Sequence, residues 1–253
     1  MRVCIFVDGE NFRHSIVELF PRFRQESYLP KSARWTDLFD WIVRSVVDGG
    51  ERIRTYWYVI ESLDFFPYRF PDPVRAQKQL YRVLSNYELY RKELDALAPE
   101  NRVTRMAEIV SELRQRSNTM RDRFDGWIAV QNGIATKHKG IEFRRAGAMT
   151  YNLFDKSLGA EKAVDVKLAC DMIILRDIYD VAVIVSGDQD YVPAVEVLKD
   201  YGKRVVNVAF KTRSGVLLPG GARRLNQMTD WSLGIEFASL AEYLQIGKSS
   251  KRK

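Results

Sequence analysis

Aspartates follow two apolar segments of the chain, and a third aspartate lies early in a predicted helix. The segment VAVIVSG is followed by Asp188 and Asp190, and the segment VCIFV ends at Asp8. If both segments are central strands of a parallel sheet, their carboxyl ends meet at one edge, where sites form. The helix that carries Asp165 begins at that same edge. Carboxylates gathered without basic partners repel one another, and Mg²⁺ or Mn²⁺ removes that cost.

The same aspartates also have ordinary structural interpretations, which these residues alone leave open. Asp188 and Asp190 fit a polar turn that caps the following helix, and Asp165 fits the first turn of its own helix. Asp171 lies six positions after Asp165, about 600° around a helix, so it points elsewhere and is left out of the metal set. A lone histidine is more often structural than catalytic, so neither histidine is assigned a role.

The elements that must position these residues alternate between strands and helices. Apolar and β-branched segments predict strands over 2–9, 52–60, 181–187 and 203–210, with β-like composition also over 139–154. Helical spacing predicts helices over 34–50, 160–175 and 191–202. Such a succession implies right-handed crossovers and a mostly parallel sheet. Three prolines predict a loop over 61–73.

The middle of the chain has a different character. Residues 74–98 and 101–125 read as two long polar helices separated by Pro99, which predicts an antiparallel helical hairpin. We therefore expect a single domain over 1–245, with a helical insertion at about 72–138, and a disordered basic tail over 246–253. The two amphipathic helices of the insertion could bury the same face of a second copy, so a homodimer is also expected.

Composition adds a preference for a polyanionic partner. The formal charge is +7 and the isoelectric point about 9.3. The two cysteines suggest no disulfide scaffold and favour a reduced, cytoplasmic setting. No segment reaches the roughly 18–20 apolar residues that a membrane span needs, so no membrane partner is expected.

Three segments of the chain, CIFVDGENF, EKAVDVKLACDMI and VIVSGDQDYVPAVEVLKDYGKRVVNVAF, resemble the signature blocks of the NYN domain family. That family belongs to the PIN-like nucleases, and the LabA-like group is the most similar. The resemblance implies a PIN-like αβα sandwich and metal-dependent cleavage of RNA. The family's acids fall on Asp8, Asp165, Asp188 and Asp190, and the polar companion of the first acid falls on Asn11.

The resemblance therefore implies hydrolysis of RNA phosphodiester bonds at one or two Mg²⁺ or Mn²⁺ ions. The four aspartates would hold the metal, and Asn11 would position the attacking water or the scissile phosphate. Basic residues outside the acidic pocket would hold the RNA. The acid-free stretch 203–224, interpreted as a loop after the last strand, and the helical insertion offer Lys203, Arg204, Lys211, Arg213, Arg223, Arg224, Arg116 and Arg123.

Three other functions fit parts of the pattern. A Toprim-type magnesium enzyme also has an Asp-x-Asp pair after a buried strand, but it needs a glutamate where Asp8 stands. A haloacid-dehalogenase-type phosphatase needs Asp-x-Asp after the first strand, and the chain has Asp-Gly-Glu there. A non-catalytic RNA-binding or regulatory module, with a metal for structure only, would keep the same acids.

Overall fold

A computed structural model describes residues 1–21, 23, 29–218 and 222–246. The predicted basic tail lies outside the described residues, apart from Ile246. The chain divides into two compact units, which are described separately. Unit 1 comprises Met1–Glu61, Trp127–Gly147 and Lys162–Lys253, and unit 2 comprises Ser62–Gly126 and Ala148–Glu161.

Unit 1 is built on the parallel part of the sheet. In strand order, the sheet reads β4-β3-β2-β1-β5-β6-β7, and β8 pairs with β6. Val7 pairs with Val185, so β1 and β5 end together, and Val185 pairs with Val208 of β6, which continues to Lys211. The strands are β1 (Arg2–Asp8), β2 (Glu51–Phe66), β3 (Ile141–Asn152), β4 (Leu158–Lys162), β5 (Val181–Val185), β6 (Arg204–Lys211), β7 (Leu217–Leu218) and β8 (Trp231–Ile235).

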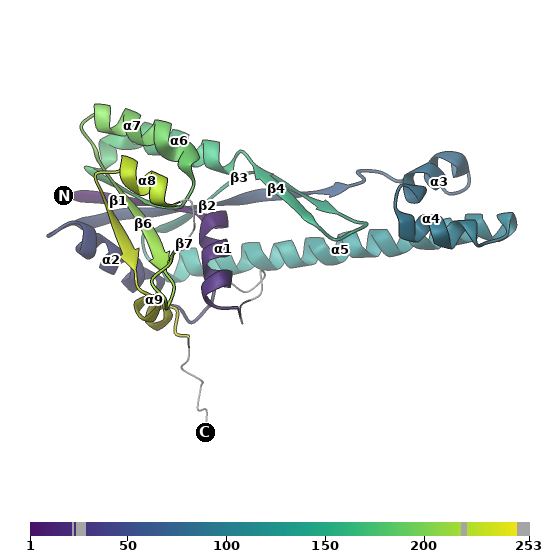
Figure 1. Ribbon diagram of the computed structural model, residues 1–253, viewed down its shortest axis with the longest axis horizontal. Helices are drawn as coiled ribbons and strands as arrows, with labels where there is room; N and C mark the ends of the chain where they lie inside the picture. Colours follow the sequence, from purple (N-terminus) through teal and green to yellow (C-terminus); the bar gives the residue numbers. More distant parts are fainter. Residues whose placement is uncertain (22, 24–28, 219–221, 247–253) are drawn as a thin grey trace, which may run out of the picture. The chain divides into compact units, whose positions relative to one another are not determined.

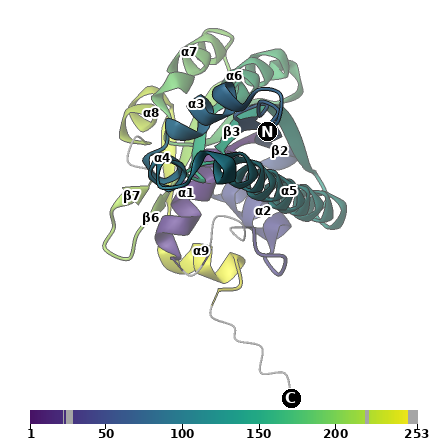
Figure 2. The ribbon, with the colours of Figure 1, turned by 90° about the vertical axis from the view of Figure 1, so that its right-hand side faces the viewer.

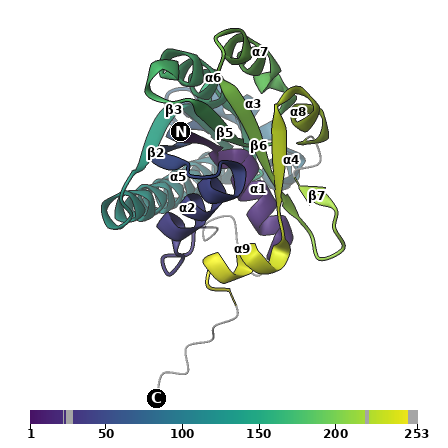
Figure 3. The same cartoon turned by 90° about the vertical axis from the view of Figure 1, so that its left-hand side faces the viewer.

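Helices cover both faces of this sheet. The first face carries α1 (Gly9–Leu19), α2 (Trp35–Val46) and α9 (Phe237–Tyr243); the second carries α6 (Val164–Ile174), α7 (Val192–Asp200) and α8 (Ala222–Met228) (Figures 1 and 3). Successive side chains of a strand point to opposite faces. In β1, Val3, Ile5 and Val7 pack against the first helical layer, whereas Cys4 and Phe6 pack against the second. Unit 1 is therefore a three-layer αβα sandwich.

Two short 3₁₀ helices connect elements on the second face. One is η2 (Arg176–Ile178), which follows α6, and the other is η3 (Gln189–Tyr191), which joins β5 to α7. The η3 turn begins at the carboxyl edge of the sheet, because it follows directly on the end of β5. It therefore lies where the sequence predicts the functional residues.

Unit 2 contains α3 (Gln77–Ser85), α4 (Glu88–Asp95) and the first part of α5 (Pro99–Lys137). Figure 2 shows α3 and α4 beside each other. Their buried leucines, Leu80, Leu84 and Leu94, form the apolar side of these helices. The remaining parts of β2, β3 and β4 complete this unit.

The structure confirms the αβα fold class and the predicted strands, but the predicted two-helix hairpin is wrong in detail. The first helix is broken into α3 and α4, because Tyr87 adopts an extended backbone and stacks on Phe154 at a ring distance of 3.9 Å. The second does not end near residue 125 but continues to Lys137.

Two other boundaries differ from the sequence prediction. Strand β2 continues through Phe66, into the segment predicted as a loop. Strand β6 is not the last one, because β7 and β8 follow it. Among the residues that the structure describes, none of the helices has both the length and the apolar character of a bilayer-spanning segment.

Candidate metal centre

Asp8 is buried at the carboxyl end of β1 and is the N-cap of α1. Its Oδ1 accepts hydrogen bonds from the backbone amides of Glu10 (3.1 Å) and Asn11 (3.0 Å). These bonds satisfy amides that have no partner within the helix, and the helix N-terminus favours a negative charge. The strand and the helix together therefore hold this carboxylate in one orientation.

The second oxygen of Asp8 has three side-chain donors. Oδ2 accepts from Asn11 Nδ2 at 2.6 Å, from Ser186 Oγ at 2.7 Å and from the Tyr191 hydroxyl at 3.2 Å. Burial raises the pKa of the Asp8 carboxyl to about 6, although the bonds from Asn11 and Ser186 oppose the rise. The site is thus built for an anion at neutral pH, and it holds that anion at a cost in desolvation.

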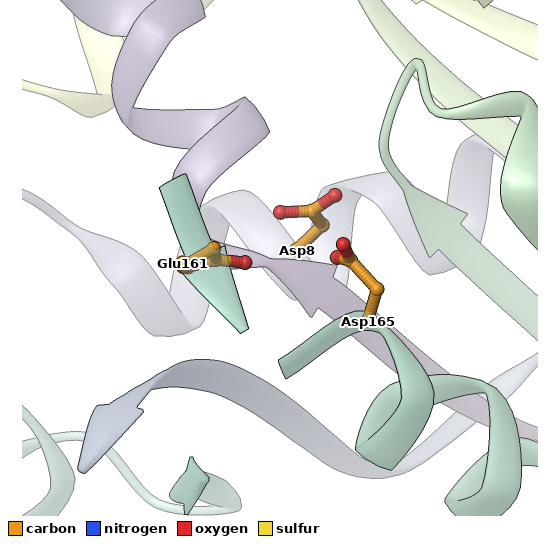
Figure 4. Close-up of side chains that lie close together, drawn as sticks. All are labelled: Asp8, Glu161 and Asp165. Carbon is orange, nitrogen blue, oxygen red and sulfur yellow. The ribbon is translucent and has the colours of Figure 1, made fainter. Parts of the chain in front are cut away.

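Asp165 lies in the first turn of α6 and is half-buried. Its Oδ1 accepts a hydrogen bond from the same Tyr191 hydroxyl, at 2.7 Å. Burial raises the pKa of Asp165, and the negative charges of Asp188 and Asp190 raise it further. The carboxyl groups of Asp8 and Asp165 lie next to each other in Figure 4.

One carboxylate oxygen of Asp8 lies within 4.8 Å of one carboxylate oxygen of Asp165. These oxygens are the ligand type that Mg²⁺ and Mn²⁺ prefer. Among the described residues, no lysine or arginine forms an ion pair with Asp8 or Asp165. A divalent cation is therefore the charge that this arrangement fits, and the acidic cluster could bind one.

Asp188 and Asp190 lie beside this pair but outside the close group. Asp188 caps η3, where its Oδ1 accepts from the backbone amide of Asp190 at 2.9 Å. Asp188 is half-buried and Asp190 is exposed. Both are near enough to raise the pKa of Asp165. Direct coordination by these two aspartates stays a prediction.

Ser186 and Tyr191 connect the site, although neither was predicted from the sequence to belong to it. Ser186 Oγ donates to Asp8 and accepts from the Asp188 amide at 3.0 Å. The buried Tyr191 hydroxyl lies between Asp8 and Asp165, and burial raises its pKa, so it remains a donor. Their one sequence signal is position: both flank the Asp-x-Asp pair.

Asp171 belongs to a separate cluster. It is buried, and it accepts hydrogen bonds from the Tyr58 hydroxyl (3.1 Å), from Lys167 Nζ (2.9 Å) and from Arg144 (2.5 Å). Burial raises the pKa of Asp171, but Lys167 and Arg144 lower it, and the net change is a decrease. A carboxylate neutralised in this way holds α6 against the sheet and has no free charge for a metal.

The predicted RNA-binding residues lie on several elements of the two units. Lys203 and Arg204 lie at the amino end of β6, the edge opposite Asp8, where Lys203 donates to the Tyr179 carbonyl at 3.0 Å. Lys211 pairs with Glu236 at 2.7 Å, and Arg213 lies 4.5 Å above the Phe237 ring. Arg223 and Arg224 are exposed on α8, and Arg123 is exposed on α5. Arg116 donates hydrogen bonds to the Leu153 and Phe154 carbonyls.

Comparisons with known proteins bear on the whole chain. A search of curated proteins finds no match. One solved structure that is similar is a crystal structure of a protein of unknown function from Vibrio parahaemolyticus, with 15% identity, 92% of each chain covered and a TM-score of 0.43. The family model of the NYN domain matches residues 78–218. Because these residues are more than half of the chain, the protein belongs to the NYN domain family, within the PIN-like nuclease superfamily.

Proposed function

We propose that the protein is a metal-dependent ribonuclease that hydrolyses RNA phosphodiester bonds at the Asp8–Asp165 centre. NYN proteins are in general ribonucleases, and PIN-like nucleases typically use divalent metals. The observation that carries the proposal is the pair of Asp8 and Asp165, which share the Tyr191 hydroxyl and form no ion pair with a lysine or arginine in the part of the chain that the structure describes.

Asp8 and Asp165 would hold Mg²⁺ or Mn²⁺. When bound, such an ion lowers the pKa of a water and offsets charge on the phosphate. Asp188 and Asp190 extend the negative edge of the same centre and are proposed as further ligands, direct or through water. The fit lies in the chemistry of the donors, which are all carboxylate oxygens.

The surrounding side chains position these acids. Asn11 and Ser186 fix the Asp8 carboxylate, and Tyr191 fixes Asp8 and Asp165 relative to each other. One Nδ2 proton of Asn11 is used by Asp8, so the second Nδ2 proton and the amide oxygen remain to orient a water. Groups that hold ligands in place in this way affect metal affinity and activity strongly.

The test is cleavage of a labelled single-stranded RNA with Mn²⁺, with Mg²⁺ and with EDTA. We expect cleavage with either ion and none with EDTA. Asp165→Asn, which removes one charge and keeps the size, should abolish cleavage. Asp200→Asn, the same change at an exposed position at the end of α7, is the matched control and should cleave as the wild type does.

Undiminished cleavage by Asp165→Asn would refute the assignment of this centre. Binding of RNA without cleavage by the wild type would point instead to a non-catalytic binding module.

The proposal has three further parts: membership of the LabA-like group, a cytoplasmic location and a homodimer formed through the helical insertion. The sequence motifs support the group membership, the two free cysteines support the location, and the amphipathic helices support the homodimer.

A further inference from the structure

Unit 2 contains a second candidate site, a cavity of about 470 Å³. Its walls come from α5 and from the end of β2 with the residues that follow it, all within this unit. Three arginines line it, Arg69, Arg114 and Arg121, and none of its lining residues is acidic. Ligand pockets have volumes of roughly 300–1,000 Å³, so the cavity is large enough for a nucleotide.

One wall of the cavity is a single face of α5. Arg114, Ser117, Asn118 and Arg121 have the spacing i, i+3, i+4 and i+7, which places them side by side along a helix. Leu113, Met120 and Phe124 are buried, so the polar face is presented by a helix that is anchored from another side. The hydroxyl of Ser117 and the amide of Asn118 supply hydrogen-bonding groups between the two cations.

The other wall is aromatic. Phe65 is buried and packs edge-on against Tyr151, with a ring distance of 6.2 Å. Phe70 packs in the same manner against Phe154, at 6.3 Å. The backbone of this wall is tied down, because the Leu153 amide donates to the Phe66 carbonyl at 2.8 Å. These contacts fix the positions of the aromatic rings.

Tyr68 is the exception among these rings, because it is 73% exposed. A large aromatic side chain that lines a pocket and remains in solvent has its ring face available for stacking. Stacking on an aromatic ring is the sequence-tolerant way in which proteins hold the bases of a single strand.

The arginines of the cavity are not neutralised. In 62–126 and 148–161, all of which the structure describes, no ion pair joins an acid to Arg69, Arg114 or Arg121. By contrast, Arg105 on the same helix pairs with Glu93, Glu108 and Glu112. Arg121 lies 5.1 Å above the Phe65 ring, which leaves its charge in place.

Asp72 is an acid that interacts electrostatically with Arg114 of the cavity. Backbone hydrogen bonds lower its pKa, and the charge of Arg114 lowers it a little further. Its Oδ1 accepts from the amides of Val74 and Arg75, both at 2.8 Å. Asp72 therefore caps its own turn, and the cavity keeps a surplus of positive charge.

We infer that this cavity binds a single-stranded segment of RNA, with phosphates on the arginines and a base stacked on Tyr68. Arginine clusters without acids complement phosphates, and Ser117 and Asn118 can bond the sugar or a base edge. The inference rests on the proposed function, because RNA is the substrate proposed for the metal centre. It assigns substrate binding to Arg69, Arg114 and Arg121.

The test is the binding of a fluorescent single-stranded RNA, followed by anisotropy in EDTA so that no cleavage occurs. Arg114→Ala/Arg121→Ala should weaken binding at least tenfold. Losing two phosphate contacts should also reduce the slope of log K against log salt by about 1.4. Arg82→Ala/Arg91→Ala is the matched control: it removes two exposed arginines of the same unit that do not line the cavity, and should bind as wild type.

The stacking role has its own pair of variants. Tyr68→Ala should weaken RNA binding by about 5- to 150-fold, the range expected for one stacked base, whereas Tyr68→Phe keeps the ring and should bind nearly as wild type. Because Tyr68 is exposed, neither change is expected to disturb folding, which thermal unfolding of each variant checks.

The outcomes separate this inference from the proposed function. With Mn²⁺, all cavity variants should hydrolyse the small diester bis(p-nitrophenyl) phosphate like the wild type, because it needs only the metal centre. Wild-type RNA binding by the Arg114→Ala/Arg121→Ala variant would overturn the cavity assignment and leave the ribonuclease proposal intact. A wild type that binds no single-stranded RNA, or that prefers an acidic aromatic peptide, would also overturn it.

Discussion

At Asp8, burial and hydrogen bonding have opposite effects on the charge. The carboxylate is fully buried, and five hydrogen-bond donors surround it. Hydrogen bonds favour its charged form, and burial disfavours that form more strongly, since the net effect raises its pKa to about 6. One hydroxyl proton on Tyr191 cannot satisfy both Asp8 and Asp165. A cation therefore stabilises two anions that the protein alone stabilises incompletely.

Metal binding should consequently depend on pH. A proton on Asp8 competes with the metal, so Mn²⁺ affinity should fall about tenfold per pH unit below a pKa near 6 and be constant above it. Tyr191→Phe removes a hydrogen bond that lowers the pKa of Asp165. In this variant the increase of Mn²⁺ affinity with pH should therefore occur at higher pH. Titration calorimetry between pH 5 and 8 measures both; a flat profile for the wild type would contradict this account of Asp8.

Ser186 acts on the site through Asp8. Ser186→Ala removes the donor to Asp8 Oδ2 and the acceptor of the Asp188 amide. Loss of such a supporting group costs roughly 10–100-fold in metal affinity or activity. Calorimetry with Mn²⁺ checks this value, and Ser232→Ala, at an exposed position of β8, is the control. Equal affinities for the two variants would remove Ser186 from the site.

Much of the site's residue content could be predicted, because the aspartates directly follow buried strands or begin a helix. Ser186 and Tyr191 could not, since a serine in a turn and a tyrosine at a helix start have ordinary uses. Their significance depends on which strands are neighbours, and local sequence does not show that.

At the scale of elements, the junction between β1 and α1 determines where Asp8 lies. Gly9 follows Asp8, and a Cβ at Gly9 would lie 2.2 Å from the Tyr58 carbonyl oxygen of β2. Only glycine lets the helix begin so close to the neighbouring strand. The close approach therefore holds the helix N-terminus, and with it the cap on Asp8, against the sheet.

Gly9→Ala should therefore destabilise unit 1, by about 1–3 kcal/mol as for other overpacked positions. The matched change is Gly133→Ala on α5, where a Cβ would meet nothing within 4 Å. An alanine there should stabilise the protein by roughly 0.5–1 kcal/mol, because glycine is the poorer helix former. Urea unfolding of both variants gives the two values. Equal effects at the two glycines would show that the approach to Tyr58 is not tight.

The strands and the first helices were predictable because their apolar periodicity is strong and local. The interruption of the helical pattern at Tyr87 and the extension of β2 to Phe66 were not predictable. Tyr87 interrupts a continuous helical pattern because it stacks on Phe154, a residue far along the chain. Likewise, β2 runs on to Phe66, near three prolines, because its last residues pair and pack within unit 2, where Phe65 meets Tyr151.

At the scale of the whole molecule, the family match and the site overlap only in part. The match over 78–218 includes Asp165, Asp188 and Asp190 but not Asp8. Asp8 joins them through the fold, because β1 pairs with β5 in parallel and both strands end at one edge. The match also begins inside the segment predicted to be an insertion, at residue 78.

A ligand that binds only the folded protein stabilises it, and the metal proposed for unit 1 should do so. At a metal concentration 100 times its Kd, the gain is about 2.7 kcal/mol, or roughly 5–10 °C in Tm for a protein of this size. Calorimetric scans with Mn²⁺ and with EDTA should show this difference for the wild type, for Asp200→Asn and for the Arg114→Ala/Arg121→Ala variant of unit 2. Asp165→Asn should lose it. A shift of equal size in Asp165→Asn would mean that Mn²⁺ binds elsewhere, since that variant lacks one of the two carboxylates on which the centre depends.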